Sequence, residues 1–176
     1  MMIMMIIVGL VGCAVRYSVR PEISAKLFQV RKIRSTFKYY KRSMILPYIT
    51  RSEIKNPDSE ELQAGSQFLF FLIDELKKRG FELVDSPPTD PFLDVEIDFA
   101  YKKPIPFLFA GAIAARMRAS LEGNLLFEIT DYKELFLFTG IPSPEIFTQK
   151  ARVLAGLLSE RFAEELGAFS EQSPNN

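Results

Sequence analysis

A strict alternation of apolar and charged residues over 92–101 constrains the fold of this chain more than any other feature. The segment reads FLDVEIDFAY, so apolar side chains fill every second position and carboxylates fill three of the positions between them. Successive side chains of a β-strand point to opposite faces, so this pattern predicts a strand with one buried face. Residues 114–121 alternate in the same way, with Arg116, Arg118 and Ser120 on one face. The sequence therefore predicts two amphipathic strands.

The charges on these strands predict how they pair. In an antiparallel hairpin, an index sum of 214 sets Asp98 opposite Arg116 and Glu96 opposite Arg118. A shift by one residue would turn the apolar set of one strand into water, which disfavours odd sums, whereas sums of 212 and 216 stay open. Each ion pair contributes at most about 1 kcal/mol, so the pairs select the register more than they stabilise the fold.

Capping residues predict two helices. Asp58 is a good N-cap with Glu61 three residues later, and Gly80 follows a basic last turn. Ser143 and Pro144 start the second helix, which we expect to end at Gly167. Apolar residues recur at helical spacing in both, namely Leu62, Leu69, Ile73 and Leu76 in the first and Phe147, Ala151, Leu154, Leu158, Phe162 and Leu166 in the second.

Further strands are expected at 43–49, 81–85, 124–130 and 134–139, with a turn at 131–133. This order predicts an α+β fold, a two-layer sandwich of a mostly antiparallel sheet with two helices packed on one face. We divide the chain into a signal-like hydrophobic segment at 1–12, a basic N-terminal segment at 13–42, a single α+β domain at 43–167 and a loose tail at 168–176.

The composition excludes most catalytic templates. The chain has no histidine, no tryptophan and one cysteine among 176 residues, so Cys/His zinc sites, Ser-His or Cys-His nucleophiles and CxxC redox pairs are excluded. We therefore expect no enzymatic activity, no cofactor and no metal. The carboxylates of Asp94, Glu96 and Asp98 keep a hydrolase or a calcium site as a less favoured alternative, because any half-exposed strand shows such a pattern.

The apolar run MMIMMIIVGLVG opens the chain and leads directly to the only cysteine, Cys13. As a helix this run would span about 18 Å, less than the roughly 30 Å of a bilayer core, which is typical of a secretory signal. Leu10-Val11-Gly12-Cys13 resembles the bacterial lipobox, in which the cysteine is acylated and becomes the mature N-terminus. The alternative is a buried strand or a short uncleaved anchor, with Cys13 an inert apolar thiol.

The resemblance implies a membrane anchor and a location. A lipobox implies attachment to the membrane through an N-terminal acyl group, and Ala14, which is not aspartate, is associated in that family with an outer membrane location facing the periplasm. The pattern of residues 43–166 also resembles small envelope lipoproteins of unknown function and, more loosely, the lipoprotein of the lipopolysaccharide-assembly machinery. It implies a non-enzymatic, lipid-anchored assembly, scaffold or interaction component with an envelope protein partner. The alternative is a domain that binds a hydrophobic ligand between sheet and helices.

Basic residues are concentrated near the N-terminus. Residues 16–55 carry eleven Lys and Arg against two acidic residues, which gives this segment a charge of +9. A basic segment beside a lipid anchor is suited to the phosphates of a membrane surface, and a secreted location argues against nucleic acid as the partner. The alternative is a solvated strand face that pairs with the acidic half of the chain. The predicted basic surface consists of Arg31, Lys32, Arg34, Lys38, Lys41 and Arg42.

The connection at 102–115 is unusually apolar for a hairpin loop. Its sequence KKPIPFLFAGAIAA places large apolar residues where a short polar turn would suffice. A large exposed apolar patch marks a membrane or protein contact, whereas the alternative is a segment that folds back over the core. The expected contact residues are Lys102, Lys103, Ile105, Phe107, Leu108, Phe109 and Ile113.

Overall fold

A computed structural model describes residues 13–18, 21–27, 30–42, 49–86, 91–103, 111–135 and 144–171. The elements within these residues are, in chain order, β1 (Cys13–Arg16), α1 (Pro21–Leu27), β2 (Lys32–Arg42), β3 (Ile49–Glu53), α2 (Ser59–Lys78), β4 (Glu82–Leu83), β5 (Phe92–Lys102), β6 (Gly111–Leu121), β7 (Asn124–Leu135) and α3 (Pro144–Glu171).

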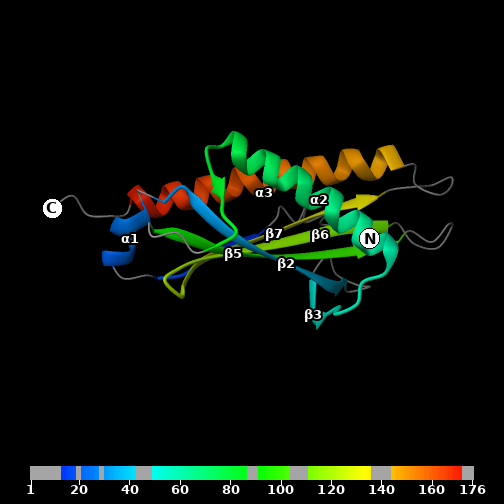
Figure 1. Ribbon diagram of the computed structural model, residues 1–176, viewed down its shortest axis with the longest axis horizontal. Helices are drawn as coiled ribbons and strands as arrows, with labels where there is room; N and C mark the ends of the chain where they lie inside the picture. Colours follow the sequence, from blue (N-terminus) through cyan, green and yellow to red (C-terminus); the bar gives the residue numbers. More distant parts are fainter. Residues whose placement is uncertain are drawn as a thin grey trace, which may run out of the picture.

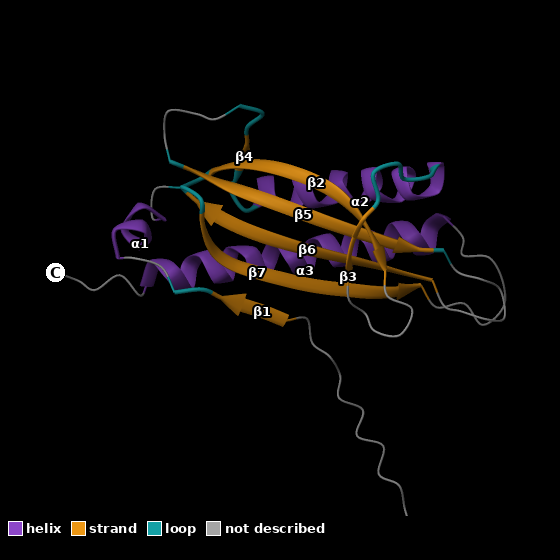
Figure 2. Cartoon of the chain, turned by 90° about the horizontal axis from the view of Figure 1, so that it is seen from below, coloured by secondary structure: helices purple, strands orange, loops and turns teal. Residues whose placement is uncertain are grey.

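The strands form one sheet in the order β1-β7-β6-β5-β2-β3, with β4 paired to β2 beside this path. Helices α2 and α3 lie next to each other on one face (Figure 1), and the view from below shows the sheet in front of both helices (Figure 2). Neighbouring strands are antiparallel, except that β2 runs parallel to β4 and β5. The predicted α+β fold, with a mostly antiparallel sheet and two helices on one face, is confirmed.

The hairpin of β5 and β6 has the predicted register. Asp98 lies opposite Arg116 and Glu96 opposite Arg118, and the same register continues to the end of β5. On the helix side, Ile97 faces Met117, and both are almost fully buried. The alternation of charge and apolarity therefore determined this pairing, because a slip by one residue would have exposed one of the two apolar sets.

The turn predicted at 131–133 is wrong, because β7 continues without a break to Leu135. Asp131 pairs with Ala115 of β6 and is only 5% exposed. Its carboxylate faces α3, where Arg161 Nη1 lies 3.7 Å from Asp131 Oδ2. A buried charge next to an opposite charge can thus occupy a strand position that the sequence pattern assigns to a turn.

The predicted ends of α2 are confirmed. The Asp58 side chain accepts a hydrogen bond from the Glu61 backbone N–H, and the Glu61 side chain accepts one from the Asp58 N–H, which is a complete capping box. At the other end, Gly80 has φ +85°, and the Phe81 N–H donates to the Leu76 carbonyl. This is a Schellman ending, in which glycine supplies the left-handed conformation.

The apolar stripe predicted for α2 is partly wrong. Leu62 is 45% exposed, and the buried face consists of Ala64, Gly65, Phe68, Leu72 and Leu76. Phe68 stacks on Phe99 of β5 with ring centroids 5.1 Å apart, and this contact sets the rotation of the helix. A Cβ atom at Gly65 would lie only 2.6 Å from the Tyr39 hydroxyl oxygen, so glycine allows α2 to approach β2 closely.

The stripe predicted for α3 is confirmed. Its five residues from 151 onward are at most 5% exposed, namely Ala151, Leu154, Leu158, Phe162 and Leu166. The helix passes Gly167, where we expected its end, and continues to Glu171. One glycine within a helix costs only about 1 kcal/mol, which the packed stripe outweighs.

The segment at 13–42 contributes two strands to the same sheet. β2 lies between β5 and β3, and β1 pairs with β7 at the opposite edge of the sheet. On β2, Ile33 is fully buried, whereas Arg34 is partly exposed. The sheet therefore extends into the segment that we had kept apart from the α+β domain. Of the strand expected at 43–49, residues 43–48 lie outside the described residues, and β3 begins at Ile49.

Candidate functional site

The sheet face opposite the helices carries a row of ion pairs across β2, β5 and β6. Two β2 cations are paired with β5 carboxylates: Arg34 Nη2 lies 2.6 Å from Asp94 Oδ1, and Lys38 forms an ion pair with Glu96. The parallel register places Arg34 beside Asp94 and Lys38 beside Asp98. Glu96 lies two residues before Asp98 on the same face of β5, within reach of the long Lys38 side chain. The strands themselves therefore position these charges, without help from loops.

Asp98 is the centre of this row, and its side chain is 0% exposed. Its Oδ2 accepts hydrogen bonds from Arg116 Nε at 2.8 Å and from Arg118 Nη2 at 3.0 Å, whereas its Oδ1 has no hydrogen-bond partner among the described residues. The Arg116 guanidinium also lies 5.9 Å from the Tyr40 ring centroid. Tyr40 and Ile49 belong to a small apolar cluster on this face, which helps to keep water from Asp98.

The pKa of Arg118 reflects these surroundings. Partial burial disfavours its charged form, but the attraction of Asp98 and Glu96 outweighs this effect and raises the pKa of Arg118 above its ordinary value. The hydrogen bond from Lys38 to Glu96 likewise raises the pKa of Lys38. Both shifts favour the cationic forms of Lys38 and Arg118.

The three strand carboxylates are all held in ion pairs. Asp94, Glu96 and Asp98 are all bound by Lys or Arg, so none is placed as a general acid or base for an incoming substrate. The described residues also contain no group of three or more Cys, Asp or Glu that is suited to hold a metal ion. The hydrolase and calcium alternatives would both require carboxylates that are available to a ligand.

The predicted basic surface is divided by the structure. Arg34 and Lys38 lie in the ion-paired row, Arg31 Nη1 donates to the Val30 carbonyl at 3.1 Å, and Lys32 and Lys41 also take part in interactions. Arg42 is the last residue of β2. For Arg34 and Lys38 the ion pairs favour the alternative interpretation, a strand face that pairs with the acidic half of the chain.

The apolar connection after β5 is described only at its two ends. Ile113 is 0% exposed and lies in the core beside Tyr101, so the prediction that Ile113 contacts a membrane or partner is wrong. Lys103 forms an ion pair with Glu60, next to a hollow of about 210 Å³ at the start of α2. Lys102 is the last residue of β5. The other predicted contact residues, Ile105, Phe107, Leu108 and Phe109, lie outside the described residues.

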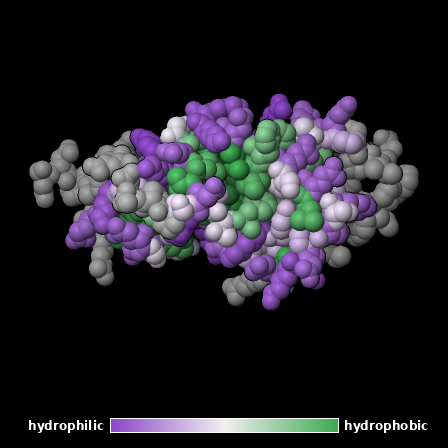
Figure 3. All heavy atoms as spheres, viewed as in Figure 1, coloured by the Kyte–Doolittle hydropathy of each residue, from purple (hydrophilic) through white to green (hydrophobic). Residues whose placement is uncertain are grey.

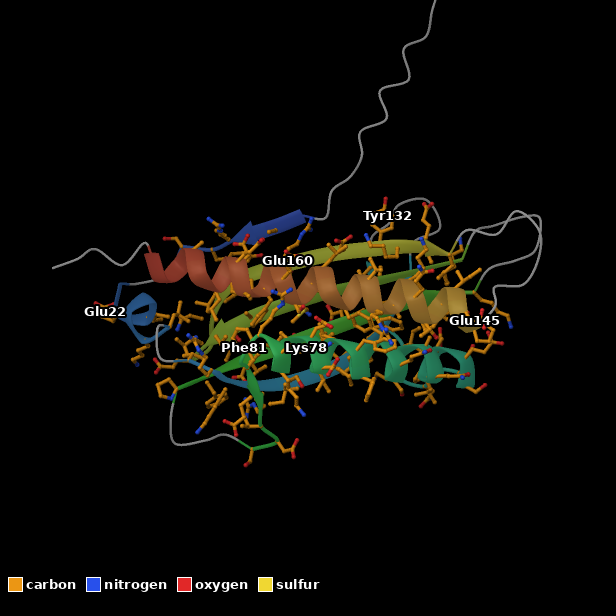
Figure 4. The ribbon with its side chains drawn as sticks, turned by 90° about the horizontal axis from the view of Figure 1, so that it is seen from above. Glu22, Lys78, Phe81, Tyr132, Glu145 and Glu160 are labelled. Carbon is orange, nitrogen blue, oxygen red and sulfur yellow. The ribbon has the colours of Figure 1, made fainter. Side chains whose placement is uncertain are left out.

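β1 is an edge strand, and Cys13 is its first residue. Cys13 pairs with Thr130 of β7, and after the strand the Tyr17 N–H donates to the Leu126 carbonyl at 2.8 Å. Figure 2 shows β1 at the margin of the sheet, and Figure 4 shows it beside β7 with α3 next to them. Arg16 forms an ion pair with Glu165 of α3. The cysteine of the lipobox-like sequence is therefore built directly into the folded sheet.

Two large side chains remain exposed at β1 and directly after it, and the sequence patterns missed both. Val15 is 47% exposed and Tyr17 is 39% exposed. A second apolar area lies over α2 (Figure 3), where Phe70 is 68% exposed. None of the helices among the described residues is long and apolar enough to cross a membrane.

No protein-family model and no curated protein matches the sequence. Among solved structures, a minor lipoprotein from Acinetobacter baumannii is 11% identical over 78% of this chain and 93% of its own, with a TM-score of 0.41. The PelC dodecamer from Paraburkholderia phytofirmans is 8% identical over 83% of this chain and 96% of its own, with a TM-score of 0.41. An uncharacterised protein is 12% identical over 78% of this chain, with a TM-score of 0.42. These likenesses concern the general course of the chain and do not assign a function.

Proposed function

We propose that this protein is a non-enzymatic lipoprotein of the bacterial cell envelope, anchored by acyl chains on Cys13. The observation that carries the proposal is that the lipobox-like cysteine is also the first described residue of the sheet. Cleavage before Cys13 would remove the apolar run and leave every described strand and helix intact. A cleaved signal requires that the folded elements follow the cysteine, as all the described strands and helices do.

The role that we propose is that of an assembly, scaffold or interaction component with an envelope protein partner. The carboxylates of the sheet are held in ion pairs, which supports a role without catalysis. The alternative, a hydrophobic ligand between sheet and helices, is less favoured because packed aromatic rings occupy that layer. Phe68, Phe99, Phe127 and Phe162 are all 0% exposed, and the rings of Phe127 and Phe162 lie 5.4 Å apart.

Lipidation is tested by expression of the full chain in a Gram-negative host, followed by mass spectrometry of its N-terminal peptide. We expect a peptide that begins at residue 13 and carries acyl chains, and accumulation of the uncleaved precursor when globomycin is added. The Cys13→Ser variant is the matched control and should be neither cleaved nor acylated. An unmodified Cys13 within an uncleaved chain, or a Cys13→Ser variant that still fractionates with membranes, would contradict the proposal.

Location is tested separately by fractionation of the membranes. We propose an outer membrane location facing the periplasm. In the lipoprotein pattern the residue after the cysteine influences this location, and here that residue is Ala14. Ala14 is exposed, so Ala14→Asp should leave the fold intact and shift the protein to the inner membrane fraction. Equal distribution of both forms between the two membranes would contradict this assignment.

A further inference from the structure

The lipidation site and the folded sheet have no spacer between them. Cys13 is paired with Thr130, and Ala14, Val15 and Arg16 pair with the next three residues of β7. An extended spacer of ten residues would allow a domain to move roughly 35 Å from its anchor. In this chain the acylated residue itself is part of β1, so the sheet edge must lie at the lipid headgroups.

The residues next to the anchor leave apolar side chains exposed. Val15 and Arg16 point to opposite faces of β1 because side chains alternate along a strand. The register assigns Val15 to the side opposite the helices, because it lies beside Glu128, whereas Arg16 reaches Glu165 of α3 on the other side. Val15 and Tyr17, two and four residues after the anchored residue, are 47% and 39% exposed.

We propose that β1 rests on the bilayer surface, with Val15 and Tyr17 in contact with lipid at headgroup level. This inference rests on the proposed lipidation of Cys13. Tyrosine is enriched at membrane interfaces because its ring is apolar and its hydroxyl is polar, and an exposed valine beside it adds apolar contact.

This contact orients the whole molecule. The sheet order makes β1 the strand nearest to the bilayer and β3 the farthest. Strands lie about 4.8 Å apart, so β3 would be on the order of 24 Å from β1, and the ends of the strands would point along the membrane rather than into it. The apolar area of α2 around Phe70 would then face the periplasm instead of the lipid.

The test uses tryptophan fluorescence, because the chain contains no tryptophan and each variant therefore reports one position. The acylated full-length Tyr17→Trp variant is reconstituted into phosphatidylethanolamine–phosphatidylglycerol vesicles with and without brominated acyl chains. We expect brominated lipid to reduce its emission at least twofold. The Phe70→Trp variant is the matched control, an exposed aromatic position on α2, and we expect its emission to change by less than a tenth.

A second variant tests the short connection. Ten Gly and Ser residues inserted between residues 13 and 14 should reduce the quenching of Tyr17→Trp by more than half, because the anchor no longer holds β1 at the surface. Unchanged quenching would show that the short tether does not position β1 and would overturn the inference.

Failure of the inference and failure of the proposed function give different results. Acyl chains are measured by mass spectrometry and vesicle attachment by flotation on the same samples. An acylated, vesicle-bound Tyr17→Trp variant without quenching would overturn the membrane contact alone, and a dimer on light scattering would then identify a second copy as the occupant of the β1 edge. Protein without acyl chains would overturn both proposals.

Discussion

Replacement of Asp98 by asparagine tests whether the charged row on the sheet is structural. Asn keeps the shape of the side chain but removes the charge that Arg116 and Arg118 contact at hydrogen-bond distance. Removal of one partner from a buried ion pair costs about 3–5 kcal/mol. The side chains of Arg116 and Arg118 are 21% and 29% exposed, and Arg118 Nη2 keeps its contact with Glu96 Oε2 at 3.2 Å. We therefore expect a loss at the lower end of this range, about 3 kcal/mol.

Asp94→Asn is the matched control on the same strand. The side chains of Asp94 and Arg34 are both 38% exposed, so the loss of this pair should cost at most about 1 kcal/mol. Urea unfolding followed by circular dichroism gives both free energies, and we expect the melting temperature of Asp98→Asn to fall by roughly 6–12 °C. A loss below about 0.5 kcal/mol for Asp98→Asn, or equal losses for both variants, would refute the reasoning from burial.

Three further predictions concern packing and ionisation. Gly65→Ala should destabilise the protein by about 1–3 kcal/mol through its clash with an aromatic ring of β2, whereas Gly156→Ala, with open space around it, should stabilise it by about 0.4–1 kcal/mol in the same unfolding assay. Phe68→Ala should cost about 3–5 kcal/mol and Phe70→Ala less than about 0.5, because only the first ring is buried; similar losses would contradict the assigned rotation of α2. Burial raises the pKa of Tyr101, so the stability that its neutral form contributes is present below the ordinary tyrosine pKa and is lost as pH rises through the raised pKa; absorbance at 295 nm in Tyr101→Phe should show a smaller late part of the titration, to which Tyr39, whose pKa burial also raises, still contributes.

Local patterns in the sequence predicted local features of the fold. The hairpin register followed from alternating charges, and the ends of α2 followed from Asp58, Glu61 and Gly80, because neighbouring residues determine both. The place of β2 in the sheet was missed, although Ile33 is fully buried, since its cations suggested a surface segment. Its parallel partner β5 lies far along the chain, and no local pattern indicates such a pairing.

The candidate site was predictable only in part. The sequence predicted the pairing of Asp98 with Arg116 but not the complete burial of Asp98. Asp94 belongs to the same alternating pattern on the same strand, yet its side chain is 38% exposed. The difference arises from the small apolar cluster around Tyr40 and Ile49, which residues distant in sequence bring together. The exposure of Val15 could not be predicted either, because it depends on which elements cover the edge of the sheet at β1.

The pairing of β1 with β7 also determines the order of events during biosynthesis. Among the described strands, β1 is the first to be made and its partner β7 is the last, so β1 has no described partner until almost the whole described sheet has been synthesised and exported. During that interval Cys13 lies in an unpaired chain, where a modifying enzyme can reach it. Once β7 arrives, the same residue becomes part of a hydrogen-bonded strand. Under the proposed function, completion of the fold therefore closes the period in which the anchor can be attached.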